Sequence, residues 1–131
     1  MAAAHRFEEL ECWQLGDELK RGLFAVAGGP RARQDRRFRD QIRDAASSVT
    51  RNISEGFGRK SDPEFVRYLS IARASLNECQ DELKDALRHA YVNREEYQRL
   101  LVLSRRTVGA IAGLQRYLRK QIRDRNRDKG R

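Results

Sequence analysis

Four polar side chains interrupt or border the apolar stripes of this sequence, and they are the residues best placed to do chemistry. Asn52 falls on an apolar stripe with Glu55 beside it, and Ser75 and Glu78 flank the next stripe along the chain. A buried amide, hydroxyl or carboxylate costs free energy unless it is hydrogen-bonded. These groups could fix the register between helices or bind a ligand. On either interpretation, we expect Asn52 to lie inside the protein and to bond to Ser75 or Glu78.

The residue types that commonly bind metals or attack substrates form no recognised pattern. A di-iron bundle needs two Glu-x-x-His pairs, and the nearest approach is Asp85 four residues before His89. Cys12 and Cys79 fall on apolar stripes, which favours small core residues over a zinc site or a disulfide. The Gly-Phe-Gly segment at 56–58 follows no strand and lacks a correctly spaced lysine and serine, so it is not a phosphate loop. The sequence predicts no enzyme activity, no cofactor and no small-molecule substrate.

Apolar residues at helical spacing organise the whole chain. Segment 65–90 has the clearest pattern, because its apolar side chains recur at alternating steps of four and three, which only a helix explains. A Gly-Gly-Pro break at 28–30 and predicted caps at Ser61 and Asn93 separate the helices. We predict helices at about 7–27, 34–57, 62–90 and 94–123, and a frayed basic tail at 124–131. Short connections favour an all-α, antiparallel up-down-up-down four-helix bundle, formed as a single domain by residues 1–131.

The N-terminal segment lacks the long apolar stretch of a signal peptide. No apolar run approaches the roughly eighteen residues that a membrane-spanning helix needs. We therefore expect a cytoplasmic protein that does not interact with a membrane.

Positive charge is concentrated in two parts of the sequence. The net charge is +9, with +5 in residues 31–60 and +8 in residues 105–131. In an up-down bundle, the turn between the second and third helices lies at the same end as the C-terminus of the fourth. The cations gathered there, called the basic pole below, are candidates for binding nucleic acid: Arg59, Lys60, Arg67, Arg116, Arg119, Lys120 and Arg123. Arginines at 31–39 form a second group at the opposite end. The same composition also fits an ordinary solvated helix surface.

Three stretches carry a family resemblance. They are Phe7-x-x-Leu10-x-x-Trp13-Gln14, then Gln41-Ile42-Arg43 on to Asn52-Ile53-Ser54-Glu55-Gly56 and Ser61, and then Phe65 on to Ser75 and Glu78. In these stretches the chain resembles the four-helix bundle proteins associated with intervening sequences in bacterial 23S rRNA genes. The resemblance marks a set of polar core residues: Arg43, Asn52, Glu55, Ser75 and Glu78. It implies an up-down bundle that assembles as a ring of five, without established enzymatic activity. By analogy with accessory bundles of diversity-generating retroelements, it also implies binding of nucleic acid and a polymerase.

A second apolar line on the fourth helix predicts association with other chains. Each residue of this second line comes one position before a residue of the main apolar stripe of the same helix. One position corresponds to a rotation of about 100°, so the second line lies on a different side of the helix. The first helix has a smaller excess of apolar residues. Exposing all of them would create a patch of the size that marks an interface. We predict a homo-oligomer, with the pentamer taken from the resemblance, and these candidate interface residues: Leu10, Trp13, Phe24, Leu100, Leu103, Leu114 and Tyr117.

Two functions therefore stay open. The first is an oligomeric accessory protein that binds structured RNA or DNA, and the second is a structural module whose partner is itself or another protein. Aromatic residues off the main stripes, such as Trp13 and Tyr68, could stack on bases or line a protein interface. Salt dependence separates the two functions, because phosphate binding weakens steeply as salt rises.

Overall fold

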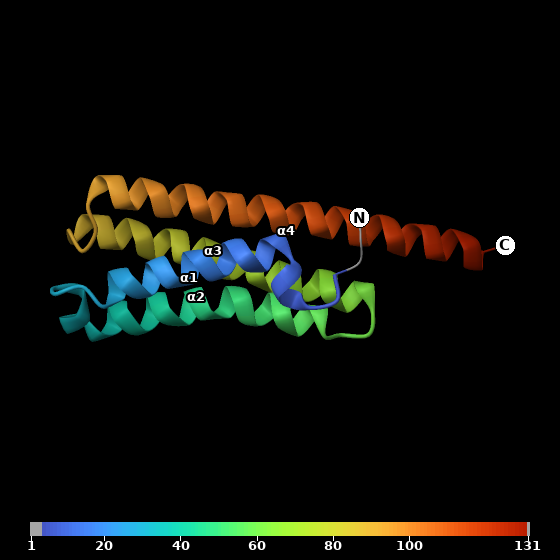
Figure 1. Cartoon of the computed structure of the whole chain (residues 1–131), viewed down its shortest axis with the longest axis horizontal. Helices are drawn as coiled ribbons and strands as arrows, with labels where there is room; N and C mark the ends of the chain where they lie inside the picture. The colour runs from blue at the N-terminus through green and yellow to red at the C-terminus, as the bar shows by residue number, and fades with distance from the viewer. Residues whose placement is uncertain (1–3, 131) are drawn as a thin grey trace.

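The computed structural model describes residues 4–130 as a bundle of four long helices (Figure 1). In chain order, the elements are the short 3-10 helix η1 (Phe7–Glu9), α1 (Glu11–Ala27), the 3-10 helix η2 (Ala32–Gln34), α2 (Arg36–Phe57), α3 (Asp62–Arg88) and α4 (Arg94–Lys129). Each helix packs against its neighbours in the chain, and α1 also packs against α4. Within residues 4–130 there is no strand. The predicted all-α up-down-up-down bundle is confirmed.

One apolar core fills the space between the four helices. Its largest fully buried apolar side chains are Leu19, Leu23, Ile42, Val49, Ile53, Leu69, Leu76, Leu83, Leu100 and Ile111. Cys12 and Cys79 are unpaired and belong to this core, as the stripes predicted. Burial raises the pKa of each thiol to about 12, because the thiolate loses its hydration inside the protein. At neutral pH both cysteines are therefore small apolar residues.

The first three helices differ from the predicted ranges at their ends. The helix expected from residue 7 is broken at Leu10, whose extended backbone separates η1 from α1 while its side chain enters the core. The second helix begins at Arg36 instead of residue 34, because Asp35 caps it by accepting a hydrogen bond from the Phe38 amide at 3.2 Å. The third helix ends at Arg88, and Ala90 has a left-handed backbone with φ of 57°. These ends depend on single backbone angles, which periodicity does not reveal.

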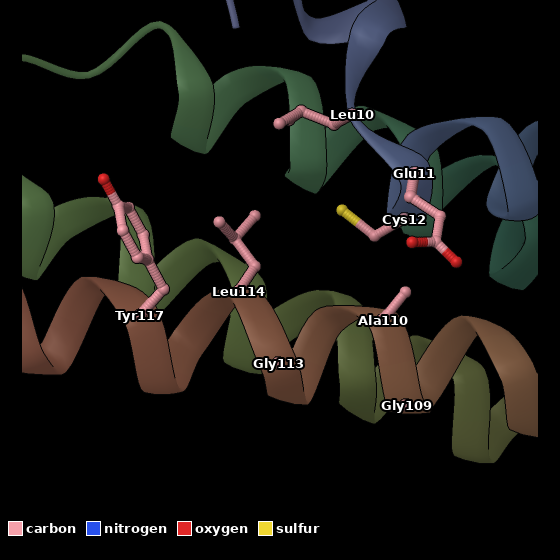
Figure 2. Close-up of a pocket in the computed structure, with 8 residues that line it drawn as sticks. All are labelled: Leu10, Glu11, Cys12, Gly109, Ala110, Gly113, Leu114 and Tyr117. Carbon is pink, nitrogen blue, oxygen red and sulfur yellow. The ribbon is translucent and has the colours of Figure 1, made fainter. Parts of the chain in front are cut away.

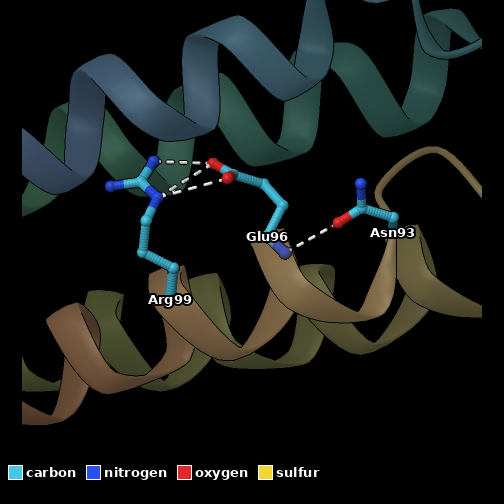
Figure 3. A network of polar contacts seen from close by, with 3 residues as sticks. All are labelled: Asn93, Glu96 and Arg99. Atoms are coloured by element: carbon cyan, nitrogen blue, oxygen red, sulfur yellow. Dashed lines mark hydrogen bonds and ion pairs between the residues drawn. The ribbon is translucent and has the colours of Figure 1, made fainter.

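The start of α4 agrees with its predicted cap. The side-chain oxygen of Asn93 accepts a hydrogen bond from the Glu96 amide at 2.7 Å (Figure 3). The Glu96 carboxylate in turn accepts from Arg99 at 2.6 Å, and this bond lowers the pKa of Glu96. An acidic group in the first turn also complements the helix dipole. The last acidic residue before a long basic stretch thus has a structural role.

The end of α4 corrects the prediction of a frayed tail. The helix continues to Lys129 and extends past the ends of the other three helices (Figure 1). Residues 114–129 contain neither glycine nor proline, so nothing in their backbone chemistry stops the helix before Gly130. An ion pair of 2.8 Å between Arg125 and Asp62 connects this segment to the start of α3. Of the predicted tail, residue 131 lies outside the described residues. Among those described, no helix is apolar enough over a sufficient length to cross a membrane.

Candidate nucleic-acid interface

The residues of the basic pole lie where the predicted topology put them. The turn between α2 and α3 and the C-terminal part of α4 share one end of the bundle (Figure 1). The Arg125–Asp62 ion pair holds these two regions together. All seven predicted cations are exposed to solvent: Arg59, Lys60, Arg67, Arg116, Arg119, Lys120 and Arg123. Charges from elements distant in sequence are therefore gathered at one end of the bundle.

Two of these arginines are organised around Tyr68. The guanidinium carbons of Arg59 and Arg67 lie 4.9 Å and 4.8 Å from the centre of its ring, within the range of a cation–π interaction. Arg59 also donates hydrogen bonds to the Tyr68 hydroxyl and to Glu55, the latter at 2.9 Å. Glu55 is exposed, so its predicted place in the polar core is wrong. Because Glu55 offsets part of the Arg59 charge, Arg67 contributes more to the positive potential.

The outward side of α4 carries more positive charge than the prediction included. No acidic residue occurs between Glu96 and Asp124. Arg105, Arg106 and Arg127 are also exposed, and within residues 4–130 none of them forms an ion pair. The acid-free stretch is visible in the sequence and could have identified Arg105 and Arg106. Arg127 was missed because the tail was expected to fray.

The second group of arginines, at the opposite end, is largely engaged within the protein. Arg31 donates a 2.6 Å hydrogen bond to the carbonyl of Ala90, which connects the α1–α2 loop to the α3–α4 loop. Arg36 and Arg39 both pair with Asp40, at 3.9 Å and 3.6 Å. A second link joins the same loops, because the Tyr91 hydroxyl donates to Asp35 at 2.8 Å. Contacts between these two loops therefore stabilise this end of the bundle, which carries both positive and negative charge.

Acidic residues of α3 lie near this end of the bundle, beside the α1–α2 and α3–α4 loops. Glu82 lies near Asp81 and Asp85, and its pKa is raised by burial first and then by these two carboxylates. Asp35 has a lowered pKa because it accepts hydrogen bonds from the Phe38 amide and the Tyr91 hydroxyl. Negative potential from α3 therefore weakens the attraction of this end for polyanions. The basic pole is the better candidate surface.

The polar core residues form a shorter network than expected. Asn52 is half-buried, in agreement with its place on the stripe, but its amide donates to the carbonyl and the hydroxyl of Ser48 on the same helix, at 2.8 Å and 3.0 Å. The Ser48 hydroxyl lies 2.6 Å from that of Ser75 on α3. The predicted direct bond from Asn52 to Ser75 or Glu78 is therefore wrong, and Glu78 is exposed. The hydrogen bond between Ser48 and Ser75 joins α2 to α3. It supports the interpretation that these polar residues fix the register between the helices.

Arg43, the remaining polar residue of the family pattern, lies between α1 and α2. Its guanidinium carbon is 5.6 Å from the ring centre of Phe24, and the Lys20 ammonium is 5.7 Å from the same centre. The Arg43 Nε atom is buried and has no hydrogen-bond partner within residues 4–130. Phe24 is thereby partly covered within its own chain, which reduces its value as an interface residue.

A fully buried glutamine makes the most complete polar contact between α3 and α4. Gln115 accepts a 3.0 Å hydrogen bond from Arg73 and donates to the Val66 carbonyl and the Ser70 hydroxyl, at 3.1 Å and 2.9 Å. Gln115 falls at the helical spacing of the buried residues Ile111 and Leu118, but spacing alone does not indicate its three partners. This network fixes α4 against α3 beside the basic pole.

Several residues of the candidate oligomer interface are buried within the chain, because of the way α4 packs. Leu100 and Leu103 are 0% and 5% exposed, so two members of the second apolar line are covered by the chain itself. The prediction was wrong for them because α4 packs against both α1 and α3 and needs a wide apolar face. Leu10 is also buried, and Trp13 packs edge-to-face against Phe7 with ring centres 5.4 Å apart. Tyr117 is the one exposed candidate among the described residues, and Leu114, Trp13 and Phe24 are half-buried. Leu114 and Tyr117 lie close together on α4.

Those two residues line a groove between the start of α1 and α4. The cavity has a volume of about 420 Å³ and is bordered on α4 by Gly109, Gly113, Leu114 and Tyr117 (Figure 2). A methyl group added at Gly109 would have no neighbour within 4 Å, and one at Gly113 would meet only the Arg116 side chain, at 3.7 Å. Packing inside the chain therefore does not require glycine at either position. Within residues 4–130, no cluster of three or more potential metal ligands occurs in this groove or elsewhere.

Comparison with known proteins identifies the chain. The family model described as 23S rRNA-intervening sequence protein matches residues 8–113. The chain belongs to this family. As a 23S rRNA-intervening sequence protein, it shares its fold with a crystal structure from Bacteroides thetaiotaomicron, a protein of unknown function of the S23 ribosomal protein family. That structure matches with a TM-score of 0.71 and 20% sequence identity, over 79% of this chain and 97% of the other. No curated protein matches significantly.

The family match confirms the resemblance predicted from the sequence motifs. It ends at residue 113, so all four basic-pole residues on α4 lie beyond the matched region. The family match therefore gives no information about the charge at that end of α4.

Proposed function

We propose that the protein is a non-enzymatic accessory factor that binds nucleic acid through the basic pole. The observation that carries the proposal is the concentration of exposed cations at one end of the bundle. The stretch 97–123 of α4 contains no acidic residue, and it runs to the same end as Arg59, Lys60 and Arg67. A surface of this kind attracts phosphates over several ångströms and gains entropy as counterions are released. The family description refers to 23S rRNA, which makes structured RNA the first ligand to test and DNA the second.

Charge-matched variants test this proposal. In the first, Arg116, Arg119, Lys120 and Arg123 are replaced by serine, and in the control Arg33, Arg37, Arg88 and Arg94 are replaced by serine. Each variant loses the same charge, but only the first alters the basic pole. We expect the first to weaken binding of structured RNA or DNA by at least about tenfold and the control to change it much less. Equal losses, or no loss in the first variant, would contradict the proposal, provided circular dichroism shows unchanged helicity.

We propose self-association as a second function. The groove beside Gly109 and Gly113 supports it, because both glycines leave the α4 backbone open to close approach and Leu114 and Tyr117 offer apolar contact area. The family resemblance implies a ring of five copies. Light scattering at micromolar concentration should give a mass several times the 15.3 kDa of one chain.

Two substitutions in the groove locate this interface. Leu114→Gln with Tyr117→Ser should lower the mass measured by light scattering, because both remove apolar area from the groove. The matched control is Ile71→Gln, which changes an exposed apolar residue on α3. A monomer for the unmodified protein would overturn self-association, and a smaller oligomer would overturn only the ring of five.

A further inference from the structure

We infer that the nucleic acid is a duplex, bound along the outward side of α4 through its phosphates and without stacking of its bases. This inference rests on the proposed function and adds the class of ligand. Its basis is the arrangement of the exposed cations along α4 together with the engagement of the neighbouring aromatic rings.

The cations of α4 form a straight row. At about 100° per residue, six exposed basic residues fall within a sector of about 100° on the outward side of the helix. They are Arg105, Arg116, Arg119, Lys120, Arg123 and Arg127. Their positions span about 33 Å at a rise of about 1.5 Å per residue. That length corresponds to about ten base pairs at about 3.4 Å each, so one turn of duplex matches the row.

The row is rigid, and the acidic residues nearest to it on α4 are Asp124 and Asp128 at its C-terminal end. It lies on one continuous helix, Arg94–Lys129, whose buried face is held by Gln115 and by the apolar core. Within residues 4–130, no ion pair involves any of its six cations. A duplex presents phosphates at fixed spacing, so both partners are ordered before they meet. A single strand would lose conformational freedom in order to lie along the same row.

Base stacking, the usual source of affinity for single strands, is poorly supported at this surface. Tyr68 adjoins the cations of the α2–α3 turn, and the guanidinium groups of Arg59 and Arg67 already lie over its ring. Phe57 and Phe65 pack against each other with ring centres 6.2 Å apart. Tyr117 is partly exposed, but it lines the groove between α1 and α4 and not the outward side (Figure 2). Single-strand binders depend on free aromatic platforms, which this row does not offer.

The first experiment compares ligands of equal phosphate number. The protein is titrated with DNA duplexes and RNA duplexes of about 20 base pairs. It is also titrated with single strands of about 40 nucleotides, which carry about the same number of phosphates. We expect either type of duplex to bind at least about tenfold more tightly than single strands, with a plot of log affinity against log salt whose slope approaches about −5 for six phosphate contacts. The DNA and RNA arms identify which duplex is preferred.

The second experiment changes the two ends of the row. Arg105→Gln with Arg127→Gln should weaken duplex binding and make the salt slope shallower by about two. Arg33→Gln with Arg37→Gln removes the same charge at the other end of the bundle and should leave the slope unchanged. Shortening the duplex below about ten base pairs should reduce affinity for the unmodified protein more than for the Arg105/Arg127 variant.

The outcomes separate this inference from the proposed function. Single strands that bind as tightly as duplexes would overturn the duplex inference and leave nucleic-acid binding intact. Equal slope changes in the two double variants would overturn the assignment to α4. Absence of binding to every nucleic acid would overturn both, and binding of polyglutamate in their place would indicate an acidic protein partner.

Discussion

Individual residues decide how closely the helices approach one another, and Gly56 is the clearest case. A methyl group at this position would lie 2.8 Å from both Phe65 Cδ1 and Tyr68 Cβ on α3. Because Tyr68 Cβ moves only with its backbone, Gly56→Ala should push α2 and α3 apart and lower the free energy of unfolding by about 1–3 kcal/mol. Chemical denaturation measures this change directly.

Gly109→Ala provides the matched control for that substitution. The added methyl group has open space around it, and alanine favours a helix over glycine by about 1 kcal/mol. At a protein concentration low enough to keep the chain monomeric, we expect this variant to be more stable than the unmodified protein. If both substitutions changed the free energy of unfolding in the same direction, close packing at Gly56 would not explain the effect of Gly56→Ala.

The two cysteines give a second test at the residue scale. Burial raises the pKa of Cys12 and Cys79 to about 12, so at pH 8 the thiolate fraction of each is about 10⁻⁴. A thiol reagent should therefore modify neither residue in the native protein at pH 8, and both within minutes in denaturant. Rapid native modification, detected by mass spectrometry, would mean that the helices around these residues open readily.

The sequence predicted which residues face inward better than it predicted their partners. Asn52 was placed toward the interior correctly, because position on a helix follows from spacing alone. Its bond to Ser48 was missed, since a side chain can satisfy itself on its own helix as readily as on a neighbour. Glu55 and Glu78 adjoin the same stripes yet are exposed, because a step of one residue rotates a side chain by about 100°.

Among the elements, α4 departs most from what its sequence suggested. Its second apolar line was interpreted as an intermolecular surface, but Leu100 and Leu103 are buried within the chain, and Leu100 lies against Gly22 of α1. Apolar spacing reveals the width of a buried face and does not reveal which neighbour covers it. The groove residues Leu114 and Tyr117, by contrast, are not fully covered. Opposite them, α1 begins at Glu11, and the preceding Leu10 has an extended backbone.

Removing residues 124–131 tests whether the end of α4 is helical in solution. The deletion breaks the Arg125–Asp62 pair, which is exposed on the arginine side, so we expect a loss of no more than about 1 kcal/mol in the free energy of unfolding. The mean residue ellipticity at 222 nm should stay constant or fall slightly, since helical residues are removed. A rise in mean residue helicity would show that the deleted segment is not helical.

At the scale of the whole molecule, the uneven distribution of charge predicts an unusual response to salt. The net charge is +9, and neighbouring cations of the row from Arg116 to Arg127 lie within about 10 Å of one another along α4. At about 10 mM salt the screening length is about 30 Å, and at about 150 mM it is about 8 Å, so added salt should relieve this repulsion. We expect the melting temperature of the free protein to rise over that range.

A polyanion should reverse this salt dependence. Bound ligand at about one hundred times its dissociation constant stabilises the folded state by about 2.7 kcal/mol. In low salt, heparin or RNA should therefore raise the melting temperature, and the increase should shrink as salt competes for the same cations. A polyanion-induced increase that persists at high salt would indicate contacts other than phosphate binding.

The paired loops at one end of the bundle have a consequence for how the native protein opens. Arg31 and Tyr91 each connect the α1–α2 loop to the α3–α4 loop. At the far end, the contact described for α4 beyond the buried Leu118 is the Arg125–Asp62 ion pair, and the helix then runs beyond its neighbours. Amide hydrogen exchange should therefore be graded along α4, slowest in the middle around Thr107 and Ile111 and fastest near Lys129. Fluctuations would begin at the charged end, so a ligand bound there would slow exchange in the part of the helix that is otherwise first to unfold.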